Sequence, residues 1–378
     1  MDVIILQACN TSTYFTVRLE ISKDTNNILR GIAILCIVLH NFCHWQGVCE
    51  NEFTFAVSNI TDLISSIKSG ILNAVWDIIS FFGHYGVEIF VFLSGYGLAK
   101  KHSVSIPRFG GYMRHNISKL WMLMIPGLIC YALITFITSH DFGYTAHQSF
   151  FTLTFLSHVS GNVMGNIAYG PYWYFGLTLQ LYIFYFVLVH KQKDSMLLLW
   201  SCIVIGGQLI IIHVAGAGSA LLDQLRANLF IAVPTFCLGV YVARHPVELN
   251  PRSWHCYGLS AFIAAIFLSV CPHPAAWLVS SLFWPLTLIW ICTLLPRPVK
   301  MLMLNVGILS PWIFVAHPVI RQLFYGFLPI KDEYLRWSYL VLYLIAAIAL
   351  AYIMQRTVAY VRLRYPGVLQ RRNGKLRQ

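Results

Sequence analysis

The chain has 378 residues, of which 58% are hydrophobic and only 11% are charged, and its mean hydropathy is +0.66. Soluble domains of this length do not combine such values, so the sequence predicts an integral membrane protein and excludes an ordinary soluble enzyme. The formal net charge of +12 requires no nucleic-acid partner, because basic segments beside an anionic inner leaflet explain much of it.

Apolar runs alternate with short polar stretches along most of the chain, and no long hydrophilic block remains for a second domain. We predict one membrane domain over residues 25–357, with a cytoplasmic segment before it (1–24) and a basic cytoplasmic tail after it (358–378). The N-terminal segment lacks a basic region followed by a long apolar core, so no cleaved signal peptide is expected. Ten cysteines without a Cys-x-x-Cys pair indicate neither a disulfide framework nor a metal site.

Windows of about twenty apolar residues predict an all-α fold with about ten transmembrane helices. They cover residues 28–46, 80–99, 117–138, 172–190, 196–214, 227–243, 256–271, 275–295, 304–327 and 336–357. The stretch 53–80 is expected to form an amphipathic outer loop. The apolar segment 148–162, which contains His158, is too short to span and is expected to be interfacial or re-entrant.

The distribution of basic residues predicts the orientation, because Lys and Arg collect on the cytoplasmic side of membrane proteins. With both termini in the cytoplasm, all but five of the 26 Lys and Arg residues fall on the inner side. The exceptions are Lys68, Arg226, Arg321, Lys331 and Arg336. We therefore predict cytoplasmic N and C termini.

Two predicted spans carry ionisable residues far from their ends, His40 in the first and Glu88 in the second. A helix rises about 1.5 Å per residue, so His40 lies roughly 15 Å above Arg30, and Glu88 roughly 18 Å above the inner end of its span. Both are near the middle of a hydrocarbon core about 30 Å thick, where a titratable group is costly and usually functional. The same arithmetic places His317 and Gln180 in this layer.

Histidine and glutamate at one depth suit acid–base chemistry, because a carboxylate fixes the tautomer of an imidazole and stabilises its cation. We predict that His40 acts as a general base on a hydroxyl, or carries an acyl group briefly, with Glu88 as its partner. The structural alternative is a hydrogen-bonded histidine in the core of the helix bundle.

The segments around these residues resemble acyltransferase family 3, integral-membrane enzymes that acylate bacterial surface and exported glycans. Leu29-Arg30-Gly-Ile-Ala and the apolar run to His40 look like the family's first helix, and Gly86-Val87-Glu88-Ile-Phe-Val-Phe-Leu-Ser94-Gly-Tyr96 is similar to its most specific motif. Weaker similarities follow in the expected order: the basic stretch from Tyr112 to Trp121, Pro171-Tyr-Trp173-Tyr174, Gln180 with Tyr182, Leu238-Gly239, and Gly307 to His317. The resemblance covers residues 25–357.

One spacing departs from the family pattern. The Arg and His of the first span are commonly eleven positions apart in the family, but Arg30 and His40 are ten apart, which turns His40 about 80° from the Arg30 face. A π-bulge or wide turn would restore His40; otherwise His44, about 40° from that face, replaces it, or the two share the site. We favour His40 because its depth matches that of Glu88.

The resemblance implies a cytoplasmic acyl-CoA donor, expected to be acetyl-CoA, and a carbohydrate hydroxyl as acceptor at the outer side of a bacterial inner membrane. The residues it implicates are Arg30, Arg114 and Lys119 for the donor phosphates, Ser94, Trp173 and Tyr174 for the channel or acceptor, and His44, His317 and Gln180 as substitute or accessory groups. We expect no tightly bound cofactor, no metal and no nucleic acid, with the lipid bilayer as the surrounding partner.

Two other classes compete with the enzyme. A transporter or flippase for a lipid-linked or anionic substrate would also have about ten spans and midplane ionisable groups. However, the pattern from Arg30 to His40 does not recur in the second half as an inverted repeat would. An inactive scaffold is the third class. The acceptor, the acyl group and the oligomeric state stay open.

Overall fold

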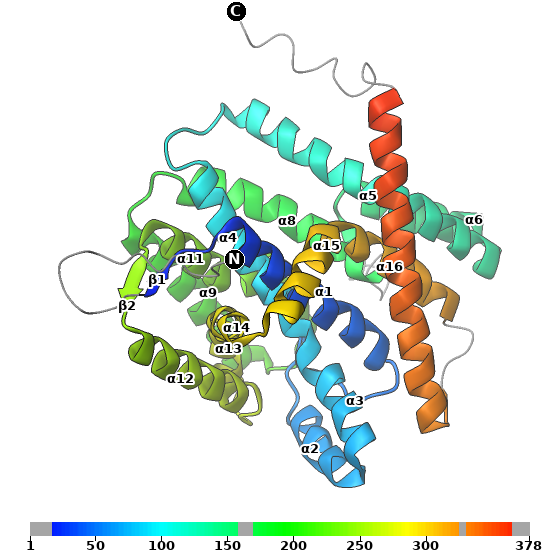
Figure 1. Ribbon diagram of the computed structural model, residues 1–378, viewed down its shortest axis with the longest axis horizontal. Coiled ribbons are helices and arrows are strands. Elements are labelled where there is room, and N and C mark those ends of the chain that lie inside the picture. The colour runs from blue at the N-terminus through cyan, green and yellow to red at the C-terminus, as the bar shows by residue number, and fades with distance from the viewer. Residues whose placement is uncertain (1–16, 158–168, 325–329, 365–378) are drawn as a thin grey trace, which may run out of the picture.

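The structure is a computed structural model that describes residues 17–157, 169–324 and 330–364 (Figure 1). It is helical apart from a short antiparallel ribbon in which β1 (Val17–Leu19) pairs with β2 (Val247–Leu249). His158 and the later part of the predicted interfacial segment lie outside the described residues, as do most of the N-terminal segment and the end of the basic tail.

The first part of the chain forms α1 (Lys23–Cys43), α2 (Val57–Ser66), η1 (Ile67–Ser69), α3 (Ile71–Phe82), η2 (Gly83–Tyr85), α4 (Gly86–Lys101), α5 (Phe109–Ser139) and α6 (Phe142–Leu153). The middle forms η3 (Gly170–Tyr172), α8 (Trp173–Phe184), the π-helical turn η4 (Tyr185–Val189), α9 (Asp194–Ala215), α10 (Ala220–Arg226) and α11 (Leu229–Arg244). The last part forms α12 (Pro251–Ser269), α13 (Pro274–Ser280), α14 (Phe283–Leu294), α15 (Arg297–Phe324) and α16 (Glu333–Arg364).

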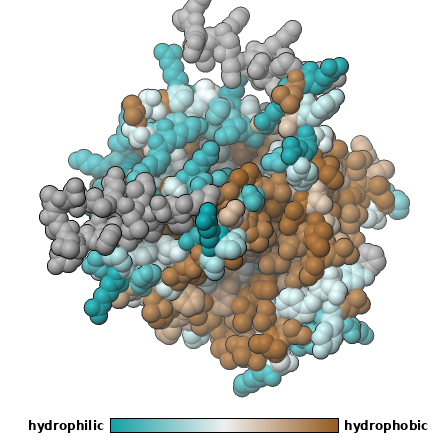
Figure 2. Space-filling view, in the orientation of Figure 1, coloured by the Kyte–Doolittle hydropathy of each residue, from teal (hydrophilic) through white to brown (hydrophobic). Residues whose placement is uncertain are grey.

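The prediction of an all-helical, multi-pass membrane protein is confirmed. Within the described ranges, eight segments are long and apolar enough to cross a membrane, and α13 with α14, bent by 43°, makes a ninth if the pair counts as one span. The eight are Lys23–Cys43, Ile71–Lys101, Phe109–Ser139, Gly170–Val189, Asp194–Ala215, Ala220–Arg244, Arg297–Phe324 and Glu333–Arg364. Figure 2 shows a broad hydrophobic face on this side of the molecule, as expected for a surface against lipid.

Three segments differ in detail from their predictions. The second span begins at Ile71 rather than near residue 80, because α3, η2 and α4 run on as one segment of 31 residues. The outer stretch before it contains the separate helix α2. Helix α12 occupies the predicted span 256–271, but it is not among the eight candidate spans.

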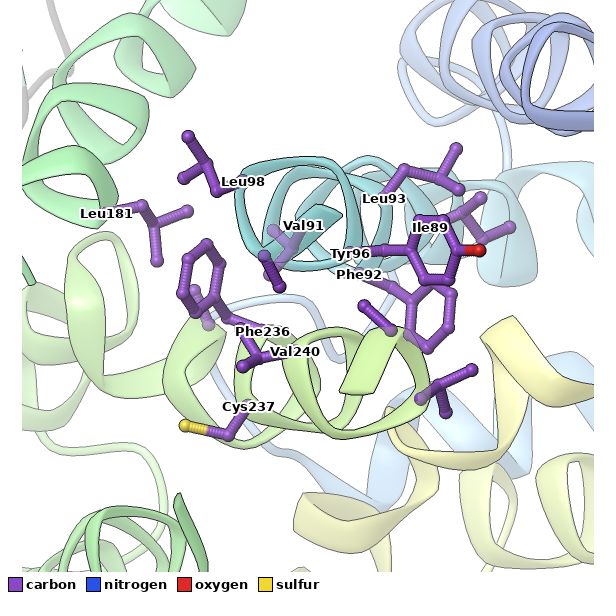
Figure 3. Close-up of a cluster of buried hydrophobic side chains, with 14 of the residues drawn as sticks. Ile89, Val91, Phe92, Leu93, Tyr96, Leu98, Leu181, Phe236, Cys237 and Val240 are labelled. Carbon is purple, nitrogen blue, oxygen red and sulfur yellow. The ribbon is translucent and has the colours of Figure 1, made fainter. Parts of the chain in front are cut away.

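Two close helix crossings organise the bundle, and each depends on glycine. Helix α1 crosses α15, where a Cβ at Gly31 would collide with the backbone of Met303. Helix α4 crosses α11, where a Cβ at Gly95 would collide with the backbone of Phe236, and apolar side chains of both helices interlock there (Figure 3). Small residues permit such close approach in membrane helices, which is the packing role expected for Gly95.

Candidate active site

His40 is held firmly in the last turn of α1. Its side chain is only 4% exposed, and its Nδ1 atom lies 2.7 Å from the carbonyl oxygen of Ser80 in α3. The helices touch at Gly83, where an added Cβ would lie 2.6 Å from the Cβ of His40. Because the carbonyl of Ser80 can only accept, Nδ1 of His40 carries the hydrogen and Nε2 keeps its lone pair.

His40 lines a cavity of about 260 Å³, which we name the histidine chamber. Residues from α1, the following loop, η2, α4, η3, α8 and α15 surround it. Its polar and aromatic lining residues are His40, Asn41, His44, Trp45, Glu50, Glu52, Phe53, His84, Trp173, Tyr174, Phe314 and Arg321. The chamber therefore combines titratable groups, one arginine and aromatic faces in a single, partly open cavity.

Three histidines are grouped in this chamber. The ring of His44 stacks on that of His40 with 5.1 Å between centroids, and the ring of His84 meets it edge-on at 5.8 Å. Helix α1 is a regular α-helix from Lys23 to Cys43, so no π-bulge or wide turn displaces His40. Both candidate histidines reach the chamber, one helical turn apart, as their i, i+4 spacing allows.

The loop after α1, residues 44–56, folds into the chamber and is named the acidic loop here. Its backbone is tied down at Val48, whose N–H donates to Asp77 Oδ1 at 3.1 Å and whose carbonyl accepts from Ser80 Oγ at 2.7 Å. Buried Asn51 accepts from the backbone of Ala56 at 3.0 Å, closing the loop. These hydrogen bonds hold the acidic loop in a defined position beside the chamber.

A buried arginine fixes the far end of the acidic loop. The guanidinium of Arg226 donates to the carbonyl of Phe53 and, through Nε, to Gln208 Oε1 at 3.3 Å. It also lies 4.3 Å from the ring centroid of Trp277. Because Arg226 is completely buried, these contacts bind the loop to the membrane bundle at a point close to the chamber.

The acidic loop brings Glu50 and Glu52 next to His40. One ligand atom from each of these three residues lies within 4.8 Å of the others, a spacing at which they could surround a metal ion.

Burial raises the pKa of Glu50, and burial together with Glu50 and Glu88 holds the pKa of Glu52 well above its usual range. Burial and Arg321 lower the pKa of His44 to about 4. The unpaired, charged form of these two carboxyl groups is therefore unfavourable, and a bound proton or a bound cation would stabilise them.

Glu88 occupies a second, smaller cavity of about 30 Å³ that shares Glu52, Phe53, His84 and Trp173 with the histidine chamber. Its side chain is 6% exposed, and its Oε2 atom has no hydrogen-bond partner in the described part of the chain. Glu52 lines both cavities and is close to His40, whereas no contact joins His40 to Glu88 among the described residues. The catalytic pairing of His40 with Glu88 stays a prediction.

Two residues predicted at the same depth have local contacts instead. Gln180 Nε2 donates to Asn228 Oδ1 at 2.7 Å, and Gln180 Oε1 accepts from the N–H of Leu229 at 3.1 Å, which ties α8 to the start of α11. His317 is completely buried, with Nδ1 3.2 Å from the carbonyl of Ile313. Neither residue lines the two cavities described above.

Of the remaining predicted residues, two line the chamber and the others lie elsewhere on α1, α4 and α5. Trp173 and Tyr174 line the chamber, while Ser94 donates to the carbonyl of Phe90 within α4 at 2.7 Å. Half-buried Arg30 and exposed Lys119 lie within electrostatic reach of each other. Arg114 is exposed on α5. Thus two of the three proposed donor-binding residues share one region.

Sequence reasoning missed Glu50, Glu52, His84 and Arg321 as chamber residues. Arg321 Nη1 donates to Asn41 Oδ1 at 2.7 Å, and its guanidinium lies 4.7 Å from the ring of Trp45. A signal existed for the glutamates, because the chain has only 14 acidic residues and two of them stand in Glu50-Asn51-Glu52, just after the first span.

The histidine chamber, with its histidines and carboxylates among apolar spans, is the candidate active site of a membrane protein. The family model described as an acyltransferase domain, that of acyltransferase family 3, matches residues 26–356. The chain belongs to this family. No curated protein and no solved structure matches it. The family assignment favours the enzyme over the transporter alternative.

Proposed function

We propose that this protein is a bacterial inner-membrane O-acyltransferase that moves an acyl group, expected to be acetyl, from cytoplasmic acyl-CoA to a hydroxyl of an exported or surface carbohydrate. Family membership over residues 26–356 supports acyl transfer. The observation that carries the proposal is the hydrogen bond from His40 Nδ1 to the carbonyl of Ser80, because it leaves Nε2 as a proton acceptor inside the chamber.

The donor would approach from the side of Arg30 and Lys119. Their proximity offers two cations to the phosphates of coenzyme A, and charge-assisted hydrogen bonds to phosphate are strong. In the orientation predicted from the basic residues, this end of the bundle faces the cytoplasm. The coenzyme would stay on the inner side while its thioester reaches the chamber.

The acceptor would enter the chamber from the opposite side, beside Trp173 and Tyr174. Flat aromatic rings suit the apolar face of a sugar, and Arg321 and Asn41 supply hydrogen-bonding groups in the same cavity. Trp173 is the more enclosed of the two rings, with 7% exposure, and it touches Phe53 of the acidic loop at a centroid distance of 5.3 Å.

The reaction itself needs one proton acceptor and no redox step. The acceptor O–H bond breaks as its proton passes to the His40–His44 pair, and the oxygen attacks the thioester carbonyl carbon. The C–S bond then breaks, and the coenzyme A thiolate takes the proton back from the imidazolium. The products are an ester and free coenzyme A.

Release of free thiol tests this proposal. The protein is reconstituted in proteoliposomes with acetyl-CoA and a panel of bacterial glycans, and thiol is measured with a chromogenic disulfide. We expect thiol release that depends on a glycan and is lost in His40→Ala, but retained in His213→Ala, a substitution at an exposed histidine of α9. Release that is equal in liposomes without the protein would reject the proposal.

A further inference from the structure

The cluster of His40, Glu50 and Glu52 has the composition and spacing of a metal site. One ligand atom from each lies within 4.8 Å of the other two. Since Nδ1 of His40 is bonded to the carbonyl of Ser80 at 2.7 Å, Nε2 is the nitrogen left for a ligand. Metal-binding histidines commonly donate their other ring N–H to a carbonyl in this way, which fixes the ring.

The two carboxyl groups have no cationic partner among the residues that the structure describes. Within the described ranges, no Lys, Arg or His forms an ion pair with Glu50 or Glu52. Arg321, the arginine that lines the chamber, donates instead to Asn41 Oδ1 at 2.7 Å. Two neighbouring carboxylates in a partly enclosed space are costly unless something positive lies between them.

In two further histidines of the chamber, the buried Nδ1 atom lacks a hydrogen-bond partner among the described residues. His84 is 6% exposed, its Nδ1 atom has no hydrogen-bond partner among the described residues, and its ring lies 5.8 Å from that of His40. The buried Nδ1 of His44 is likewise unpartnered, and its ring stacks on His40 at 5.1 Å. Unpartnered buried nitrogens around three ligand atoms point to a group that the protein binds.

We propose that His40 Nε2, Glu50 and Glu52 bind a divalent transition-metal cation in the histidine chamber. One imidazole and two carboxylates suit Zn²⁺ or Mn²⁺, whereas Ca²⁺ prefers oxygen ligands alone. The clamp from Arg226 to Phe53 and the hydrogen bonds of Asn51 hold the acidic loop in position for this role. Three protein ligands leave an open position toward the chamber.

The chemical role of this cation rests on the proposed function, whereas its binding does not. The cation would bind the acceptor oxygen at its open position and lower the pKa of that hydroxyl. With the cation bound, the lone pair of His40 would serve the metal, so the cation would replace the proton acceptance by His40 that the proposed function describes. The proton of the hydroxyl would leave on the coenzyme A thiolate.

Metal binding is measurable without any acyl transfer. The full chain, purified in detergent without a histidine tag, is treated with EDTA, dialysed and loaded with Zn²⁺ or Mn²⁺. Bound zinc is counted by mass spectrometry, and Mn²⁺ affinity is measured by the loss of the free-ion EPR signal. The variants are Glu50→Gln, Glu52→Gln and His40→Ala, with Asp62→Asn on exposed α2 as the control.

We expect one cation per chain in the wild type and in Asp62→Asn, and at least about tenfold weaker binding in each ligand variant. Monodisperse elution and an unchanged melting temperature without metal show that the near-isosteric glutamine variants fold. No binding to the wild type, or equal binding in the glutamine variants, overturns the inference. Binding as expected in a protein that transfers no acyl group would reject the proposed function and leave the metal site standing.

Discussion

The Nδ1 atom of His40 lies 2.7 Å from the carbonyl oxygen of Ser80, which joins the end of α1 to α3 inside the bundle. This contact fixes the tautomer and the ring plane of His40 without using its Nε2 atom. It exists because Gly83, three residues after Ser80, lets the helices approach until an added Cβ would lie 2.6 Å from the Cβ of His40.

Replacing Gly83 should damage both the packing and the site. In Gly83→Ala the new methyl group meets His40, and overpacking of this kind costs about 1–3 kcal/mol. We expect a lower melting temperature in detergent and reduced acyl transfer. The matched control is Gly97→Ala, because no atom lies within 4 Å of a Cβ there, so its stability should be equal or slightly higher. Equal melting temperatures for the two variants would contradict the packing described here.

The clamp between Arg226 and the acidic loop can be tested by proteolysis. In Arg226→Met the carbonyl of Phe53 and the amide oxygen of Gln208 lose a donor, at about 1–3 kcal/mol for each unsatisfied group. A glutamate-specific protease should then cut faster after Glu50 and Glu52. Arg252→Met, at an exposed arginine of α12, is the control and should cleave as the wild type does. Unchanged protection of the loop in Arg226→Met would show that the clamp is not needed.

Trp173 should affect the acceptor rather than the donor. It is enclosed between the two cavities, so Trp173→Leu removes aromatic area from the acceptor side. We expect the KM for the glycan to rise roughly tenfold, the equivalent of about 1.4 kcal/mol, with little change in the KM for acetyl-CoA. Trp121→Leu, at a tryptophan on the outer surface of α5 that is 41% exposed, should leave both values unchanged. A change in the KM for acetyl-CoA alone would show that Trp173 does not bind the acceptor.

Replacing Arg30 should change the KM for the donor rather than the KM for the acceptor. If it binds a phosphate of coenzyme A, Arg30→Gln loses a charge-assisted contact of about 1.5–3 kcal/mol, and the KM for acetyl-CoA should rise at least about tenfold. The KM for the glycan should stay the same. Arg252→Gln is again the control. Equal donor KM values for Arg30→Gln and the wild type would leave Arg30 as a topology determinant only.

The sequence allowed the spans to be predicted because long apolar runs have few alternatives to a membrane helix. His40 was found because an ionisable residue stands out in such a run. Shared depth was a weaker guide: Gln180 lies at the predicted depth, yet it contacts Asn228 and Leu229 rather than the chamber. Depth along a helix does not specify which face of the helix a side chain occupies.

Glu50 and Glu52 could not be predicted in the same way. In sequence they follow a span and look like ordinary polar residues of an outer loop. Their position beside His40 depends on the loop folding back, held by Arg226 through Phe53, which is 173 residues away in the chain. Such long-range contacts leave no periodic pattern, so only the scarcity of acidic residues gave a signal.

The most direct test of acyl transfer by this protein uses bacterial membranes that contain it and acetyl-CoA labelled in the acetyl group. We predict label in surface or exported glycan with the wild type and with His213→Ala. With His40→Ala or His44→Ala at equal expression, the loss should be about 10²–10⁴-fold, as for removal of an acid–base group. Equal labelling of glycan in all of these membranes, and in membranes without the protein, would contradict the account.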